Sequence, residues 1–279
     1  MKKILAITLL CAAIAQGASF PQDYQAALRL CESGKFAEAK TAFDQLIELN
    51  PNPQAIDRCL VQAAYCETQL KAHDKAEAIA AKIKEEHLRT LCRMNMLTLE
   101  SRYADVVTLV KDADFSLWPD ATIFDALMCR GNSSGRMRDS AAAEKDYRGA
   151  LSNTISDAKR ATAYLRLGGL FKGQQALDCL DDVMKLKEPG PTMRYQAIAA
   201  RARILAGEGK GALAIAEFDR LNDLTKQPHW TMVQMARAAT HEALGAPEKA
   251  RACYEAVAAS SNPPADSLAT AKARLAAKR

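Results

Sequence analysis

The stretch Ser33–Asn52, SGKFAEAKTAFDQLIELNPN, contains the pattern that decides the fold. After Gly34, apolar residues recur at spacings of three and four, so they share one face of an α-helix. They are Phe36, Ala39, Phe43, Leu46 and Ile47. Gly34 ends the helix before, and the sequence NPNP from residue 50 ends this one, because proline biases its predecessor towards extended conformations. Ala39 is small, which lets a second helix approach the buried face closely.

The pattern small-x-x-x-large-x-x-apolar returns along the chain, at intervals of 28 to 39 residues between first positions. Four further copies are Ala143/Tyr147/Ala150, Ala176/Leu180/Val183, Ala214/Phe218/Leu221 and Ala250/Tyr254/Val257. Two looser copies start at Val106, which is not small, and at Ala78, which lacks the large residue four positions later. The mean interval is close to the period of about 34 residues of one helix-turn-helix repeat family.

These segments resemble the second helices of tetratricopeptide repeats, whose pattern is Gly, an aromatic residue, Ala, an aromatic residue, Ala and a final Pro. The first copy carries Gly34, Phe36, Ala39, Phe43 and Pro51, with Leu46 where the family prefers Ala. The last copy carries Gly245, Ala250 and Tyr254, and departs from the pattern at Pro247 and Val257. The resemblance covers roughly residues 20–260. An unrelated all-α bundle is the alternative.

The resemblance implies an all-α, right-handed solenoid of about seven helix-turn-helix hairpins, with the first helices lining a concave groove. Such grooves hold extended peptides or partner helices. Length alone predicts about two domains, but repeats that contact mainly their neighbours favour one continuous solenoid over residues 18–279. Residues 265–279 predict a terminal capping helix, with Leu268, Ala271 and Leu275 on one face. A membrane-surface helix is the alternative for this segment.

The N-terminus has the layout of a bacterial signal peptide over residues 1–17. Lys2 and Lys3 precede an uncharged run from Ile4 to Ala15 that is too short for a bilayer span of about 20 residues. We therefore expect a periplasmic or secreted protein with no integral membrane span; lipidation at Cys11 and a retained N-terminal helix are the alternatives. Losing this segment lowers the net charge from +5 to +3. No basic stripe interleaved with aromatic residues appears, so nucleic-acid binding is not expected.

Chemistry-bearing residues show no convincing catalytic, metal or cofactor site. HEALG, residues 241–245, lacks the second histidine of a zinc-protease helix. GNSSG, residues 131–135, matches the letters of a nucleophile elbow, but a helix and not a strand is expected before it, so it is interpreted as the turn of hairpin four. An enzyme that uses a cysteine in the groove is a minority hypothesis. In the link 112–120, Phe115, Leu117 and Trp118 are expected to fold over neighbouring helices.

Seven cysteines follow the predicted signal peptide, and none forms a CxxC pair. They are Cys31, Cys59, Cys66, Cys92, Cys129, Cys179 and Cys253. Most are expected to be small buried hydrophobic residues. If one disulfide exists, the first helices of hairpins one and two are its expected place, since they carry Cys31, Cys59 and Cys66.

The sequence predicts a non-enzymatic scaffold or adaptor for protein–protein interaction in the periplasm or cell envelope. The alternative is a helical accessory subunit that positions a separate cell-wall or envelope enzyme. Arg and aromatic residues on the first helices of hairpins five to seven suit a partner protein with acidic and apolar groups. The candidate partner-binding residues are Tyr164, Arg166, Arg194, Tyr195, Arg201, Trp230 and Met235. Alternatively, the Tyr and Met side chains fill the core and the Arg side chains are merely solvated.

Overall fold

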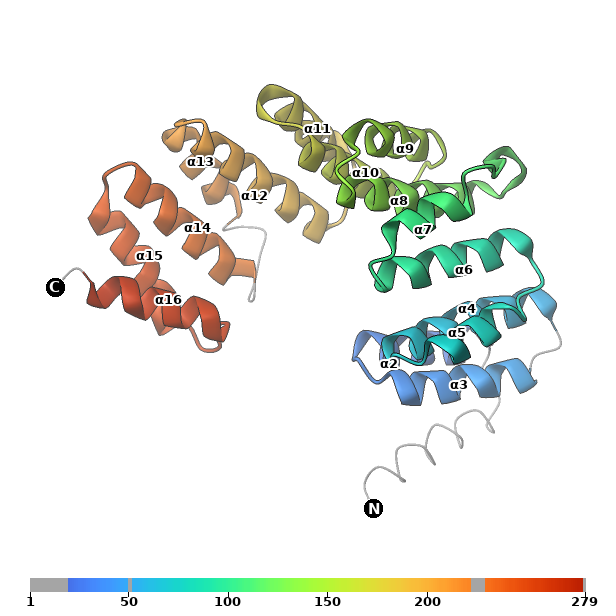
Figure 1. Cartoon of the computed structure of the whole chain (residues 1–279). Helices are drawn as coiled ribbons and strands as arrows, with labels where there is room; N and C mark the ends of the chain where they lie inside the picture. The colour runs from blue at the N-terminus through green and yellow to red at the C-terminus, as the bar shows by residue number, and fades with distance from the viewer. Residues whose placement is uncertain (1–19, 50–51, 222–228, 278–279) are drawn as a thin grey trace, which may run out of the picture. The chain divides into compact units, whose positions relative to one another are not determined.

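The computed structural model of the chain describes residues 20–49, 52–221 and 229–277. Within these residues every regular element is a helix and none is a strand (Figure 1). The chain divides into two compact units, one ending at Asn153 and the other beginning at Thr154. We call them the N-terminal unit and the C-terminal unit.

The N-terminal unit consists of four helical hairpins, in each of which consecutive helices pack together. Their helices are α2 (Phe20–Glu32) with α3 (Phe36–Leu49), α4 (Pro53–Gln69) with α5 (His73–Ala80), α6 (Glu86–Leu99) with α7 (Tyr103–Leu109), and α8 (Asp120–Arg136) with α9 (Ser140–Ser152). A single 3-10 turn, η1 (Phe115–Leu117), lies between hairpins three and four. First helices of successive hairpins also contact each other, as α4 does with α6 and α6 with α8.

The C-terminal unit consists of three hairpins followed by a single helix. Its helices are α10 (Asp157–Leu170) with α11 (Gly173–Lys185), α12 (Pro191–Gly207) with α13 (Gly211–Leu221), α14 (His229–Ala243) with α15 (Pro247–Ala259), and α16 (Ala265–Ala276). Ala271 of α16 is fully buried against the last hairpin. The predicted all-α fold of seven hairpins with a terminal helix is confirmed for the described residues. The single continuous solenoid over 18–279 stays a prediction, and the predicted signal peptide lies outside the described residues.

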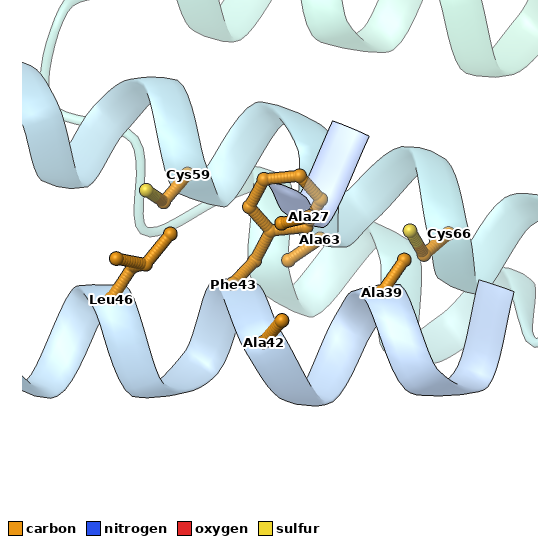
Figure 2. Packing of buried hydrophobic residues seen from close by; sticks show 8 residues of the cluster. All are labelled: Ala27, Ala39, Ala42, Phe43, Leu46, Cys59, Ala63 and Cys66. Atoms are coloured by element: carbon orange, nitrogen blue, oxygen red, sulfur yellow. The ribbon is translucent and has the colours of Figure 1, made fainter. Parts of the chain in front are cut away.

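The recurring small and large residues form the core of the hairpins, as the sequence predicts. In hairpin one, Ala39 and Phe43 are both 0% exposed. Figure 2 shows the Phe43 ring directed from α3 towards Ala27 of α2 and Ala63 of α4, all within one buried cluster. The small residues thus let three helices meet closely around one large side chain, and dispersion contacts at this density hold them together.

Hairpin two departs from the predicted register of this pattern. Ala78 is exposed, so its expected core role is wrong. The buried positions of α5 and the turn after it are Ala76, Ala80 and Ile83, at 0%, 0% and 1% exposure. Their spacing of four and three matches the pattern, but Ala80 occupies the position at which the other hairpins carry a larger residue. The sequence match to Ala78 was therefore displaced by two residues.

A backbone of positive φ closes the turn inside each described hairpin. Glycine, which adopts this conformation without strain, supplies it in hairpins one, five, six and seven. The other three turns use Lys71 (φ 63°), Ser101 (φ 61°) and Arg138 (φ 66°). Positive φ is unfavourable for residues that have a Cβ. Because these three positions are not glycines, the sequence does not reveal the turns.

GNSSG is not the turn of hairpin four, which corrects the sequence interpretation. The segment lies inside α8, and the turn falls after it, at Arg138. Ser133 is 0% exposed, and its hydroxyl donates a hydrogen bond to the carbonyl of Cys129 at 3.0 Å. A side chain at position 131 would clash with α9, because a Cβ there would lie 2.8 Å from Cε1 of Tyr147. The glycine therefore permits the closest approach of α8 and α9.

The link between hairpins three and four folds over its neighbours, as predicted for two of its three apolar residues. Phe115 and Trp118 pack against the buried cluster that includes Met94 of α6. The guanidinium of Arg130 lies 4.9 Å from the centre of the Phe115 ring, a cation–π contact. Leu117 is 81% exposed, so the prediction is wrong for this residue.

Carboxylates on first helices hold the chain that leads into the next hairpin. Asp57 of α4 is 2% exposed, and its carboxylate accepts hydrogen bonds from the backbone N–H groups of Lys84 at 3.1 Å and Glu85 at 2.9 Å. In the C-terminal unit, Asp157 of α10 accepts a bond from the N–H of Glu188 at 3.0 Å. These N–H groups lie just before the next first helix, so each carboxylate ties one hairpin to the start of the next.

We expect Asp57→Ala to lower the free energy of unfolding of the N-terminal unit by about 2 kcal/mol, because two backbone donors lose a buried acceptor. Asp57→Asn keeps one carbonyl oxygen and is expected to lose less. Urea titration followed by circular dichroism measures both, with the exposed Asp74→Ala as the control. Equal stability of Asp57→Ala and the control would contradict this role.

Candidate partner-binding surface

An apolar hollow opens between α4 and α6, the first helices of hairpins two and three. Its volume is about 360 Å³. It is lined by Val61, Gln62, Tyr65, Cys92, Asn95, Met96, Thr98 and Leu99. The resemblance implies that first helices line the binding groove of this fold. This α4–α6 hollow therefore lies where a partner is expected.

The wall of the α4–α6 hollow is built by contacts behind it. The ring of Tyr65 meets that of Phe36 edge to face, with centroids 5.9 Å apart and planes at 76°. Leu99, 41% exposed, stands at the opposite side on α6. The amide of Asn95 is exposed beside these apolar groups. A fixed aromatic wall with few polar groups is the usual character of a binding site.

A larger hollow of about 540 Å³ borders the link before α8, but its lining is different. Leu117 and Trp118 contribute apolar surface, while Glu86, Lys111, Asp112 and Asp114 surround them with charge. Covering these charges would remove them from water, which costs free energy even for the Lys111–Asp112 ion pair at 3.7 Å. The α4–α6 hollow is smaller but can be covered by an apolar group without that cost, and we regard it as the stronger candidate.

A second apolar hollow opens between first helices in the C-terminal unit. It has a volume of about 200 Å³ and lies between α12 and α14, with Phe218 of α13 behind it. Tyr195 and Arg203 of α12 and Met232 of α14 line it. Met232 is 58% exposed, and Arg203 is exposed as well. This α12–α14 hollow repeats the placement of the α4–α6 hollow within a different unit.

Two of the predicted arginines are engaged in contacts inside the C-terminal unit. The guanidinium of Arg201, 16% exposed, pairs with the carboxylate of Glu217 at 3.2 Å and with that of Asp181. Arg194 donates to the backbone carbonyls of Leu186 and Lys187, at 3.3 and 3.0 Å. These contacts account for both side chains as parts of the fold, and their role in binding a partner stays a prediction.

The other predicted residues divide between the core and the surface. Tyr195 is 5% exposed, and burial raises the pKa of its hydroxyl. Tyr164 and Met235 pack against buried clusters of hairpins five and seven. Arg166 is exposed and Trp230 is half-buried. The structure thus brings Tyr195 to the α12–α14 hollow, but not Arg194 or Arg201.

The residues that sequence reasoning missed lie mainly in the N-terminal unit. Tyr65 and Val61 stand four positions apart on one face of α4, and Asn95 and Leu99 do so on α6. In the C-terminal unit, Arg203 follows Tyr195 by eight positions on one face of α12. These spacings are visible in the sequence. The combination of Arg with aromatic residues favoured the C-terminal hairpins, whereas the N-terminal hollow is lined by Tyr, Met, Leu and amides.

Six of the described cysteines have thiols that burial makes harder to ionise. The pKa of Cys59 is raised to about 11 and that of Cys92 to about 12, and the pKa values of Cys31, Cys66, Cys129 and Cys253 are also raised. Cys92 lines the α4–α6 hollow. A nucleophilic cysteine needs a lowered pKa, so these six thiols do not support the hypothesis of a cysteine enzyme.

Over residues 20–49, 52–221 and 229–277, no group of three or more His, Cys, Asp or Glu side chains is placed to hold a metal ion. Over the same residues, no helix combines the length and the apolar character needed to cross a bilayer.

Comparison with known proteins rests on the fold. No protein-family model matches the sequence, and no curated protein matches it. A solved structure of a tetratricopeptide repeat protein from Parabacteroides merdae is similar, with a TM-score of 0.50 and 14% sequence identity. The similarity covers 93% of this chain and 98% of that one. Together with the seven hairpins and their repeated core pattern, it shows that this chain has the fold of tetratricopeptide repeat proteins.

Proposed function

We propose that this chain is a non-enzymatic scaffold for protein–protein interaction that binds a peptide or helix of a partner protein on its first-helix surface. The partner is expected to place an apolar side chain in the α4–α6 hollow. The stacked hairpins of this fold offer extended surfaces to a partner. We further propose that the protein acts in the bacterial periplasm or cell envelope, which rests on the signal-peptide layout of residues 1–17.

The observation that carries the proposal is the apolar hollow of about 360 Å³ between two first helices. In the hairpin cores, as around Phe43, alanines let the helices approach closely. Here Tyr65 and Met96 border a hollow that neighbouring side chains leave unfilled. Burying an apolar side chain there gains free energy in proportion to the area removed from water, about 25 cal/mol per Å². The nearby amide of Asn95 can both donate and accept hydrogen bonds with a partner backbone.

The raised pKa values of the thiols agree with a binding role. At neutral pH, Cys92 remains a neutral thiol in the wall of the hollow, where it behaves as a small apolar group. The same burial that prevents it from acting as a nucleophile makes it suitable as part of a surface that an apolar side chain covers.

The proposal predicts that Leu99→Lys will weaken partner binding at least tenfold, because a lysine at the rim of the hollow must lose water when the partner docks. The tagged protein, crosslinked in cells and purified from the envelope fraction, would first identify partners by mass spectrometry. Titration of a recovered partner with purified protein then gives the dissociation constant of each variant.

Leu49→Lys is the matched control, since Leu49 is a 65% exposed leucine on the second helix α3, away from the hollow. Partner binding that is unchanged in both variants would contradict the proposed site. Recovery of no partner above background, from cells in which the protein is folded, would contradict the scaffold function itself. A single recovered partner that is an envelope enzyme would favour the accessory-subunit alternative.

A further inference from the structure

Two cysteines on the first helices of hairpins one and two meet in the core of the N-terminal unit. The Sγ atoms of Cys31 in α2 and Cys66 in α4 lie 3.5 Å apart. Both belong to the cluster around Phe43, in which Cys66 is 0% exposed and Cys31 packs at the edge. A disulfide holds its sulfurs at about 2.05 Å, so this pair stands about 1.5 Å from bonding distance.

Cys59 shares α4 with Cys66 but is placed differently. Seven residues separate the two along the helix, which corresponds to about 10 Å. Figure 2 shows them at separate positions on α4, with Cys59 near Leu46 and Cys66 near Ala39. The sequence left three cysteines open for a bridge between these helices, and the geometry selects Cys31 and Cys66.

We propose that Cys31 and Cys66 are a modification site, at which an external disulfide of the glutathione or thioredoxin-like class oxidises them to an intramolecular disulfide. Cys31 reacts first because it is the half-buried member of the pair. Its thiolate attacks one sulfur of the oxidant and releases the other as a thiol, which leaves a mixed disulfide on Cys31. Cys66 then attacks the Cys31 sulfur and releases the second thiol of the oxidant.

The exchange is balanced between the two partners. Two protein thiols are oxidised, one external disulfide is reduced to two thiols, and the protons lost by Cys31 and Cys66 are taken up by the released thiolates. Burial raises the pKa of both protein thiols. Since the thiolate is the attacking species, the reaction at neutral pH is slow and its rate increases as the pH rises.

The disulfide would link α2 covalently to α4, although α3 separates these two helices in the sequence. Hairpin one is the first described hairpin of its unit, and repeats contact mainly their neighbours, so end hairpins have the fewest stabilising contacts. A bridge between residues 35 positions apart restricts the unfolded chain, and the stabilisation expected for that span corresponds to a rise of about 1–2 M in the urea midpoint of the N-terminal unit.

The test uses the purified full chain, equilibrated either with oxidised glutathione or with dithiothreitol, then alkylated and digested. Trypsin places Cys31 in the peptide 30–35 and both Cys59 and Cys66 in 59–71. Chymotrypsin, which cleaves after Tyr65, separates the last two. The expected product links Cys31 to Cys66, leaves the other six of the eight cysteines free, and raises the urea midpoint by about 1–2 M.

Three single cysteine substitutions test the proposal. Cys31→Ser should abolish both the linked peptide and the rise in the urea midpoint, and Cys66→Ser should accumulate the glutathione adduct on Cys31. Cys179→Ser, which replaces the other half-buried cysteine, should keep both. A full set of free thiols after oxidation, a stable adduct on Cys31 of the unmutated chain, or a bridge to Cys59 would each overturn the proposal. None of these outcomes depends on partner binding.

Discussion

Arg201→Ala will lower the free energy of unfolding of the C-terminal unit by about 3 kcal/mol, the cost typical of breaking a buried ion pair. Arg201 of α12 lies between the carboxylates of Asp181 in α11 and Glu217 in α13. Glu217 is only 9% exposed. Without Arg201 its remaining ion-pair partner in the structure is the half-exposed Arg220, at 2.9 Å. We therefore expect the lower end of the range for a buried pair.

The measurement is urea unfolding, with Arg166→Ala as the control. Arg166 is an exposed arginine on the neighbouring first helix α10, and its loss should change the free energy of unfolding by less than about 0.5 kcal/mol. If Arg201→Ala is as stable as the control, the contacts of Arg201 do not support the unit. A loss of partner binding in Arg201 variants is informative only if the protein is still folded.

Phe43→Ala will destabilise the N-terminal unit by about 3–5 kcal/mol, the range for deleting a buried aromatic side chain. Phe43 is 0% exposed, and its ring meets that of Tyr24 at a centroid distance of 5.6 Å. It fills the space between α2, α3 and α4, where its neighbours Ala27, Ala39 and Ala63 are too small to move into the cavity. The loss therefore includes both the burial of the ring and the cost of the cavity.

Phe43→Leu retains most of the side-chain volume and should lose less than half as much free energy, while the exposed Leu49→Ala should lose less than about 0.5 kcal/mol. Thermal and urea unfolding measure all three variants. A loss of similar size in Phe43→Leu and Phe43→Ala would show that the edge-to-face ring contact, and not the volume, dominates. A loss below about 1 kcal/mol in Phe43→Ala would refute the core role.

The sequence predicts the second helices well because the same packing arrangement recurs in successive hairpins. In most hairpins the first helix packs against a small residue and a large one that stand four positions apart on the second helix. Examples are the buried pairs Ala143/Tyr147 and Ala214/Phe218. Hairpin three departs from this pattern with Val106 at the small position, and hairpin two departs further. There Ala80 occupies the large position, the pattern loses its distinguishing residue, and Ala78 is selected wrongly.

The turns are predicted only where glycine forms them. Gly34 and Gly245 are found correctly from the sequence, since both adopt positive φ. At Lys71, Ser101 and Arg138 the tertiary packing imposes the same conformation on residues that do not favour it. In hairpin four this led to a wrong position for the turn, because GNSSG offered glycines where the chain uses them inside a helix.

The candidate site is harder to predict than the fold because a hollow is a property of two helices together. Arg201 and Arg203 are two positions apart in the sequence, yet one is held between two carboxylates and the other lies exposed at the α12–α14 hollow. The difference arises from the direction each side chain takes from α12. Ion pairs with residues 16 positions away, as in Arg130–Asp146 and Arg201–Glu217, recur between first and second helices. Searching for that spacing would have placed Arg201 in the fold.

The carboxylates of Asp57 and Asp157 also couple successive hairpins. Asp57 belongs to the first helix of hairpin two, and it accepts a hydrogen bond from the backbone N–H of Lys84, just before the first helix of hairpin three. Asp157 and Glu188 are placed in the same way in hairpins five and six. Unfolding of one hairpin therefore removes a hydrogen-bond partner from the next, so neighbouring hairpins of a unit are expected to unfold cooperatively.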